Sequence, residues 1–199
     1  MKSEFFELLI ATNNQHKLEE IRKMLPNYIR IKSLSDVNFS KELPETSGTI
    51  PGNALQKARF VWNETKINCL SDDSGLCVTS LNGEPGVDSA IYAGLPRNDS
   101  ANNSLLLKKL EGKSDRRAEF VTVMSLIING QELIFEGKIE GTISKEPLGN
   151  SGFGYDPLFI PNGYSLTFAQ MGETEKNNIS HRKNALNKVL AFLKVFNNQ

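Results

Sequence analysis

The segment that most constrains the fold of this chain is Leu8–Lys17, where an apolar run stops in a short polar loop and a helical pattern begins. Residues 8–11 are typical of a buried strand, and from residue 17 to 25 leucine and isoleucine recur at the spacing of one helix face. Pro26 then ends the helix. A strand, a polar loop and a helix in this order predict an α/β fold in which the loop can present a ligand site.

The loop itself has two interpretations. Thr12 or Asn14 could simply cap the helix, and Lys17 would then be a solvated residue of its first turn. A lysine in the first turn opposes the positive end of the helix dipole, however, and a bound anion would remove that conflict. The loop is therefore either a plain helix cap or a phosphate site.

Composition limits the class of protein. Of 199 residues 39% are hydrophobic, which is enough for one domain over residues 1–199 or for two lobes that share a sheet. Lysine plus arginine equals aspartate plus glutamate at 23 each, so we expect a small-molecule partner and no nucleic acid. No run approaches the roughly 18 apolar residues of a membrane span, and no targeting segment opens the chain, so we expect a soluble cytoplasmic protein. Cys69 and Cys77 are expected to be reduced thiols.

Strand and helix patterns alternate along the chain. Asn129-Gly130 between two long apolar segments predicts a tight antiparallel hairpin, so the sheet should be mixed. Asn53 is placed to cap a helix over residues 54–62. The other expected elements are a strand at 29–31, a polar connector at 34–47, a helix at 104–110, strands at 118–128 and 132–143, and a helix at 181–196 capped by Ser180.

Two adjacent carboxylates, Asp72 and Asp73, lie between apolar segments in the stretch Leu70–Leu76. Neighbours on an extended chain point to opposite faces, so only one of them can aim into a given site. An ordinary polar turn is the simpler interpretation, because Asp, Ser and Gly are turn residues. A metal site becomes the better interpretation if Asp73 meets Glu45 of the connector, since Mg²⁺ is held by one or two carboxylates together with substrate phosphates.

Two later segments carry aromatic and basic groups. The glycine-rich run Gly149–Pro157 contains Phe153 and Tyr155, which could stack on a base or could pack into the core. Glu175-Lys176 and Ser180–Arg182 bring donors to the start of the last helix, where a solvated charged turn is the alternative. The residues alone leave these alternatives open.

Six motifs occur in one order between about residue 8 and residue 190. They are Thr12-Asn13-Asn14-Gln15-His16-Lys17, Asn53-Ala54 with Lys57-Ala58, Ser71-Asp72-Asp73-Ser74-Gly75-Leu76, Gly83-Glu84-Pro85-Gly86, Phe153-Gly154-Tyr155-Asp156-Pro157 and Ser180-His181-Arg182. Each is moderately specific, but six in register resemble the inosine/xanthosine triphosphate pyrophosphatases, which hydrolyse non-canonical purine nucleotides.

The resemblance implies an elongated mixed β-sheet with flanking helices, which forms two lobes around a central substrate cleft. It also implies a Mg²⁺-dependent homodimer that converts ITP, dITP or XTP and water to the nucleoside monophosphate and pyrophosphate. The substrate partner would be a purine nucleoside triphosphate.

The resemblance also implies roles for individual residues. Asp73 would be the catalytic proton acceptor, and Glu45 and Asp73 would hold the metal. The implied substrate-binding residues are Thr12, Asn13, Asn14, Gln15, His16, Lys17, Lys57 and Ser74 toward the phosphates, and Phe153, Gly154, Tyr155, Asp156, Lys176, His181 and Arg182 toward the base.

The chain departs from the family pattern at two positions. Many relatives have Glu where this chain has Gly52, and many have Arg where it has Ile91. A carboxylate from position 52 is therefore lost, and the metal site depends more heavily on Glu45 and Asp73.

Three rival functions remain from the sequence. The first is a septum-associated type of hydrolase acting on modified pyrimidine triphosphates, which the segments 153–156 and 180–182 disfavour. The second is a nucleotide-binding regulator without turnover, which the presence of both Glu45 and Asp73 disfavours. The third is a nucleic-acid-binding module, which the zero net charge disfavours.

Overall fold

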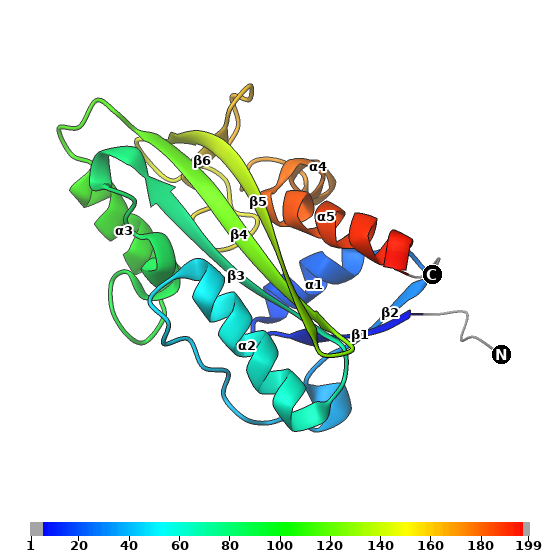
Figure 1. Cartoon of the computed structure of the whole chain (residues 1–199). Coiled ribbons are helices and arrows are strands. Elements are labelled where there is room, and N and C mark those ends of the chain that lie inside the picture. The colour runs from blue at the N-terminus through cyan, green and yellow to red at the C-terminus, as the bar shows by residue number, and fades with distance from the viewer. Residues whose placement is uncertain (1–5, 197–199) are drawn as a thin grey trace. The chain divides into compact units, whose positions relative to one another are not determined.

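The computed structural model describes residues 6–196, which form an α/β fold (Figure 1). Six strands form one sheet in the order β2-β1-β3-β4-β5-β6. In chain order the elements are β1 (Phe6–Ala11), α1 (Gln15–Met24), β2 (Ile29–Lys32), η1 (Ser35–Val37), α2 (Ile50–Thr65), β3 (Cys69–Val78), η2 (Thr79–Leu81), η3 (Gly86–Ile91), α3 (Asp99–Lys109), β4 (Arg117–Ile128), β5 (Gln131–Ile143), β6 (Phe159–Pro161), α4 (Glu173–Ile179) and α5 (His181–Phe196).

The sheet is mixed, as the sequence predicts. β1 pairs in parallel with β2 and with β3, and β5 pairs antiparallel with β6. Asn129 and Gly130 both have positive φ, of 50° and 81°, which is the backbone of a two-residue hairpin turn between β4 and β5. The parallel part of the sheet therefore lies at its N-terminal strands, and the antiparallel part at its C-terminal strands.

The chain divides into two compact units. Unit 1 comprises residues 1–73, 123–136 and 185–199, and unit 2 comprises residues 74–122 and 137–184. The division falls inside β3, β4 and β5, so each of these strands contributes residues to both units. The single-domain, two-lobe arrangement with a central cleft stays a prediction.

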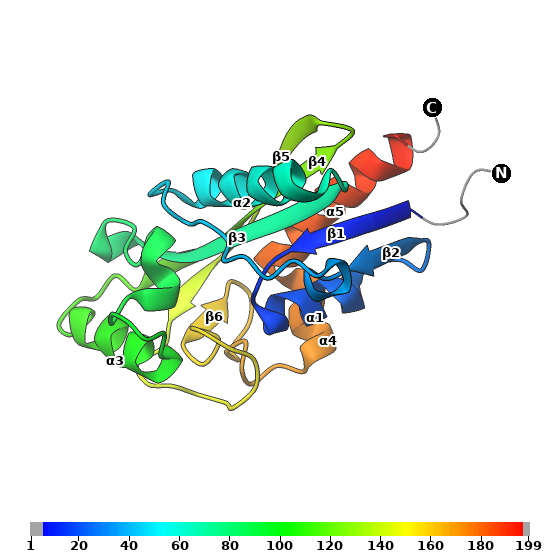
Figure 2. The same cartoon turned by 90° about the horizontal axis from the view of Figure 1, so that it is seen from below.

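Unit 1 has apolar layers on both faces of its strands because β1 alternates between them. Leu8 and Ile10 pack with the inner residues of α1 and α5, whereas Leu9 and Ala11 pack with α2. Figures 1 and 2 show α1 on one side of β1 and α2 on the other. A strand buried on both faces reads as a continuous apolar run, which is the pattern of residues 8–11.

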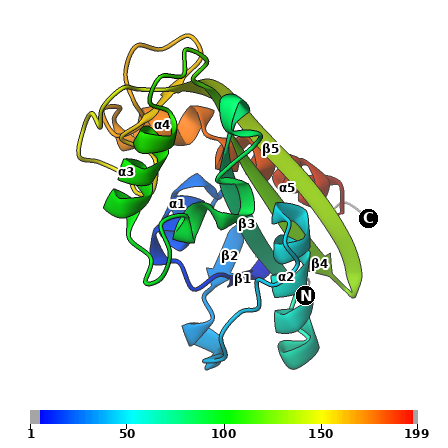
Figure 3. The same ribbon diagram turned by 90° about the vertical axis from the view of Figure 1, so that its left-hand side faces the viewer.

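Unit 2 has its own core. Leu76 and Val78 of β3 pack with Leu106 and Leu110 of the α3 segment, and the core is completed by residues that follow β5, among them Tyr155, Phe159 and Phe168. Figure 3 shows α3 beside the chain that leads from β5 toward β6. This packing holds the glycine-rich segment against α3.

Two helix starts differ from the sequence prediction. α2 begins at Ile50, and its N-cap is Thr49, whose side chain accepts a hydrogen bond from the Gly52 N–H, so the prediction that Asn53 caps this helix is wrong. Proline is tolerated in the first helical turn, where its missing N–H costs nothing, so Pro51 does not delay the helix. α3 begins at Asp99 rather than at residue 104, with Asn98 as its cap.

The connector predicted at 34–47 contains the short helix η1, but other local predictions are confirmed. The strand at 29–31 is part of β2, and the last helix spans the predicted residues 181–196. The hydroxyl of Ser180 accepts a hydrogen bond from the Lys183 N–H, as expected of a cap. Both cysteines are free thiols, and no helix within residues 6–196 is long and apolar enough to cross a membrane.

Candidate active site

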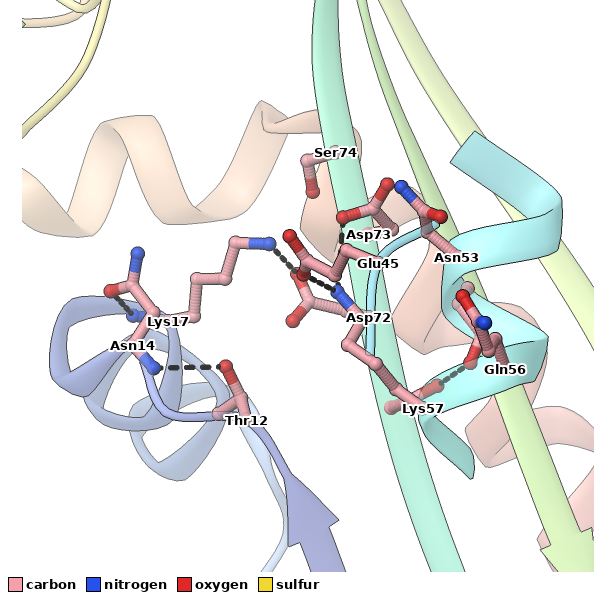
Figure 4. Close-up of polar contacts among 12 residues, drawn as sticks. Thr12, Asn14, Lys17, Glu45, Asn53, Gln56, Lys57, Asp72, Asp73 and Ser74 are labelled. Atoms are coloured by element: carbon pink, nitrogen blue, oxygen red, sulfur yellow. Dashed lines mark hydrogen bonds and ion pairs between the residues drawn. The ribbon is translucent and has the colours of Figure 1, made fainter. Parts of the chain in front are cut away.

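The loop between β1 and α1 is a helix cap that also positions a lysine. Asn14 is the N-cap, with its Oδ1 accepting from the Lys17 N–H at 3.2 Å, and Thr12 Oγ1 accepts from the Asn14 N–H at 3.2 Å. Asn14 therefore caps the helix, as one half of the cap interpretation expects, but the other half is wrong because Lys17 is not a solvated first-turn residue. Its Nζ lies 3.2 Å from Asp72 Oδ2, and its side chain is only 13% exposed (Figure 4). Residues 13, 15 and 16 of the same motif are exposed.

Asp72 and Asp73 lie inside β3 and not in a turn, so the interpretation of this motif as an ordinary polar turn is wrong. As neighbours on a strand they face opposite sides. Asp72 pairs with Lys17 of α1, and Asp73 Oδ1 accepts a hydrogen bond from Lys57 Nζ of α2 at 3.0 Å. Each carboxylate therefore meets a cation from a different helix.

Lys57 is the centre of the cluster on the α2 side. It is buried, and its Nζ lies 2.5 Å from Glu45 Oε1 as well as 3.0 Å from Asp73 Oδ1. Burial alone would lower the pKa of Lys57, but the charges of Asp73, Asp72 and Glu45 outweigh it and raise that pKa. Lys57 therefore carries a positive charge beside two carboxylates (Figure 4).

The pKa of Asp73 differs from that of an exposed carboxylate. Burial raises its pKa above the ordinary value, although Lys57 and Lys17 oppose that shift. Among the described residues its Oδ2 is buried without a hydrogen-bond partner. An unpaired buried carboxylate oxygen costs free energy, and a cation or a water proton would satisfy it.

This arrangement fits a divalent cation that binds together with substrate. Glu45 offers a carboxylate that is half exposed, and Asp73 offers the unpartnered oxygen. Within residues 6–196 no group of three His, Cys, Asp or Glu side chains could hold an ion. Mg²⁺ is usually bound by one or two carboxylates plus phosphates and waters, so two protein carboxylates are sufficient.

Two α2 side chains to which the sequence analysis gave no role in the site bind the connector residues that follow Glu45. Gln56 Oε1 accepts from the Thr46 N–H, and Gln56 Nε2 donates to Thr46 Oγ1. Asn53 Oδ1 accepts from both the N–H and the hydroxyl of Ser47. The sequence contains one signal for these contacts. Two amide residues, Asn53 and Gln56, lie in the first turns of a helix that follows a polar connector.

The same connector explains why position 52 carries no side chain. A Cβ at Gly52 would lie 2.3 Å from Ser47 Oγ and 2.7 Å from Ser47 Cβ. A carboxylate there would require the connector to move. The connector thus occupies the space in which a side chain at position 52 would begin.

In unit 2 the glycine-rich segment is organised around Asp156. Its Oδ2 accepts from Lys176 Nζ at 2.6 Å and from the Phe153 N–H at 2.9 Å, and both charged side chains are buried. A Cβ at Gly152 would lie 2.0 Å from that same oxygen, so glycine is required for this close approach. Asp156 therefore fixes the turn that carries Phe153.

The two aromatic residues of this segment behave differently. Tyr155 is buried in the unit 2 core, and its hydroxyl donates to the Ser89 carbonyl at 3.0 Å, so the core interpretation is confirmed for Tyr155. Phe153 is only partly buried, with Lys176 Nζ 5.0 Å and the Arg182 guanidinium 5.8 Å from its ring centroid. Phe153 thus presents a ring beside two cations.

The start of α5 is not a solvated charged turn, so that interpretation of the motif is wrong. Arg182 and His181 are both buried. Arg182 Nη2 donates to Ser74 Oγ at 3.2 Å, and the His181 ring stacks on Phe120 with centroids 4.7 Å apart. Ser74 Oγ also shares a hydrogen bond with Thr122 Oγ1. Ser74 therefore lies beside Arg182 of unit 2.

Unit 1 therefore gathers the buried Lys57, the partly buried Lys17 and three carboxylates, and unit 2 gathers an aromatic ring and buried donors. A comparison with known families shows to which of them a chain with these groups belongs. The model of the Ham1 family matches residues 8–192. The chain belongs to the Ham1 family.

Individual Ham1 relatives resemble this chain over almost their whole length. A dITP/XTP pyrophosphatase of Flavobacterium psychrophilum is 48% identical over 188 residues, covering 94% of this chain and 99% of the relative. A protein of the same name from Porphyromonas gingivalis is 48% identical, covering 94% and 97%. The solved structure of the Staphylococcus aureus Ham1 protein has a TM-score of 0.86 at 39% identity, covering 94% of this chain and 98% of that chain.

A Ham1 structure from Coxiella burnetii has a TM-score of 0.88 at 37% identity and covers 96% of this chain and 99% of that chain. The mixed α/β fold of this chain is thus the fold of the Ham1 proteins. The roles of the individual site residues stay predictions.

Proposed function

We propose that this protein hydrolyses dITP, ITP and XTP to the nucleoside monophosphate and pyrophosphate. The observation that carries the proposal is the contact of the buried Lys57 with Asp73 and Glu45, beside the Lys17–Asp72 pair. Two lysines next to a buried carboxylate with an unpaired oxygen suit a polyanionic substrate that arrives with a cation. The names of the Ham1 relatives supply the substrate class.

Mg²⁺ is the cation we propose, held by Glu45 and Asp73. Hard carboxylate oxygens and the absence of sulfur or imidazole ligands in this pair match its preference. When bound, the ion would offset charge on the phosphates. The side chains of Lys17 and Lys57 would offset further charge, including the charge that develops on the departing pyrophosphate.

In the reaction, Asp73 would orient the attacking water and accept its proton. Its raised pKa, caused mainly by burial, makes it a better proton acceptor than an exposed aspartate. Thr12 and Asn14 would hold phosphate oxygens at the start of α1, where the helix dipole favours negative charge. We assign Ser74 of β3 an assisting role toward the phosphates. Its hydroxyl accepts a hydrogen bond from Arg182 Nη2.

The unit 2 residues would bind the base. Phe153 would stack on the purine, and the donors Lys176, His181 and Arg182, together with Asp156, would read its edge. Hypoxanthine and xanthine carry an acceptor oxygen at position 6, whereas adenine carries an amino donor there. Two donors that face each other would stay unpaired, and hydrogen-bonding sites reject such analogues by about 10⁴ or more. A homodimer and a cytoplasmic location are further predictions of the resemblance.

The product analysis of dITP tests the reaction. Incubation with Mg²⁺ should release one equivalent of pyrophosphate and one of dIMP, without orthophosphate, and removal of the cation with a chelator should stop it. Release of orthophosphate would contradict the proposed bond cleavage. Absence of any turnover with ITP, dITP, XTP or modified pyrimidine triphosphates would instead support a nucleotide-binding regulator.

A further inference from the structure

Helix α3 binds both backbone polar groups of one glycine in the glycine-rich segment, Gly154. Asp99 Oδ2 accepts a hydrogen bond from the Gly154 N–H at 2.7 Å, and Asn103 Nδ2 donates to the Gly154 carbonyl at 3.0 Å. Residues four apart lie on the same face of a helix, so one face of α3 carries both contacts. Neither residue belongs to the motifs from which the site was predicted.

Gly154 is a position where the backbone needs such support. Its φ is +62°, in the left-handed region that glycine adopts readily, and it lies between Phe153 and Tyr155. A glycine peptide without a side chain to pack is otherwise free to rotate. One hydrogen bond orients the peptide group between residues 153 and 154, and the other orients the group between residues 154 and 155. Together they fix the backbone that carries the Phe153 ring.

Both contacting side chains are themselves held. Arg97 donates to Asp99 through Nε and Nη2, at 3.0 Å and 3.3 Å, which sets the plane of the carboxylate. Asn103 is buried, and among the described residues its Oδ1 has no hydrogen-bond partner. A buried amide oxygen without a partner lowers the stability of the protein. The Asn103 side chain therefore makes its Nδ2 contact to Gly154 in spite of this loss of stability.

The core of unit 2 does not need these two contacts. α3 is already anchored by Leu106 in the apolar cluster, and by Asn102, which accepts from the Ala93 N–H and donates to the Ala90 carbonyl. The contacts from Asp99 and Asn103 to Gly154 go to backbone groups of the glycine-rich segment and not to the apolar core. Their position therefore suits a role in arranging the base-binding segment.

We propose that Asp99 and Asn103 are positioning residues that fix the two peptide groups on either side of Gly154 and thereby hold Phe153 and Asp156 in place for a purine base. The inference rests on the proposed function, because it concerns the same base site. Neither residue touches the base. They act through Gly154 and through the turn that Asp156 closes onto the Phe153 N–H.

The test separates base binding from phosphate binding in the full chain. Inosine monophosphate probes the base site, and inorganic tripolyphosphate with Mg²⁺ probes the phosphate site, each by calorimetric titration. Asp99→Ala and Asn103→Ala should each weaken inosine monophosphate binding about tenfold and leave tripolyphosphate binding within about twofold. The KM for ITP should rise by a similar factor with kcat nearly unchanged, as expected when uniform binding is lost.

Two further variants serve as controls. Asp99→Asn keeps an oxygen that can accept from the Gly154 N–H, so it should restore most of the affinity for inosine monophosphate. Ser104→Ala removes an exposed hydroxyl that bonds only within α3, to the Ser100 carbonyl, and should leave both affinities unchanged. If one alanine variant does not fold, the other still tests the proposal.

Unchanged inosine monophosphate binding in both alanine variants would overturn the proposal. Equal losses for both probes, together with a lower melting temperature, would also overturn it, because they would indicate a purely structural role. If the wild-type protein hydrolyses no triphosphate but the inosine monophosphate losses occur as expected, the proposed function fails and the positioning role stands.

Discussion

Asp72 and Asp73 are adjacent residues of β3 with different surroundings. Asp72 is paired with Lys17, whereas Asp73 contacts Lys57 through Oδ1, and its Oδ2 has no hydrogen-bond partner among the described residues. Strand geometry alone predicts that they face opposite ways. The sequence could not show that both would be buried, because Asp-Asp-Ser-Gly is also a common turn composition.

The variant Asp73→Asn tests the role of the second carboxylate. It removes the proton acceptor and half of the proposed metal ligands while keeping the shape of the side chain. We expect kcat for dITP to fall by about 10³-fold or more with the fold retained, as monitored by circular dichroism. Glu64→Gln, which alters an exposed ion pair with Lys41, is the control and should retain activity. Near-normal turnover of Asp73→Asn would contradict the assignment.

The variant Arg182→Ala tests whether Arg182 takes part in recognition of the purine base. Arg182 is buried beside Phe153 and Ser74, so its loss removes a donor from the base site and leaves the phosphate cluster of unit 1 intact. We expect KM for ITP to rise about tenfold or more, with a smaller change in kcat. Arg59→Ala, which removes an exposed pair with Glu132, is the matched control. An unchanged KM in a folded Arg182→Ala protein would argue against this role.

At the scale of elements, the sequence predicts best where the signal is local. The β1 strand, the α1 helix and the Asn129-Gly130 hairpin follow from residues a few positions apart. The start of α2 was missed because Pro51-Gly52 is typical of loops. A proline in the first helical turn and a threonine cap just before it are nonetheless compatible with a helix.

The cap of α2 provides a test at this scale. Thr49 Oγ1 accepts from the Gly52 N–H at 3.1 Å, so Thr49→Ala should lower the free energy of unfolding by about 1 kcal/mol. Urea denaturation followed by circular dichroism measures the change. Thr49→Ser keeps the accepting hydroxyl and should restore most of the stability. Equal stability of the alanine variant and the wild type would show that Thr49 does not act as the cap.

At the scale of the whole molecule, the candidate site could not be assembled from sequence spacing. Glu45, Lys57 and Asp73 come from a connector, a helix and a strand, and their convergence depends on how unit 1 packs. The burial of Lys176 and Arg182 was also unexpected from composition, because charged residues are usually solvated. The family resemblance named these residues, whereas the patterns in the chain alone left them ambiguous.

The two units should respond to different parts of a nucleotide. Tripolyphosphate with Mg²⁺ should slow amide hydrogen exchange in residues 12–17 and 69–73 of unit 1. Inosine monophosphate should slow exchange in residues 152–156 and 176–182 of unit 2. Ligand binding raises the free energy of local opening where the contacts form, so mass spectrometry of exchanged peptides measures the difference. Protection of the same unit by both probes would contradict this division of roles.

The most direct test of the central claim is the ratio of kcat/KM among nucleotides for the wild-type enzyme with Mg²⁺. ITP, dITP, XTP, GTP and ATP are compared under identical conditions by pyrophosphate release. We expect ITP, dITP and XTP to be preferred, with ATP disfavoured by about 10⁴-fold because adenine presents a donor to the donors of the base site. Equal kcat/KM values for ATP and dITP would contradict it.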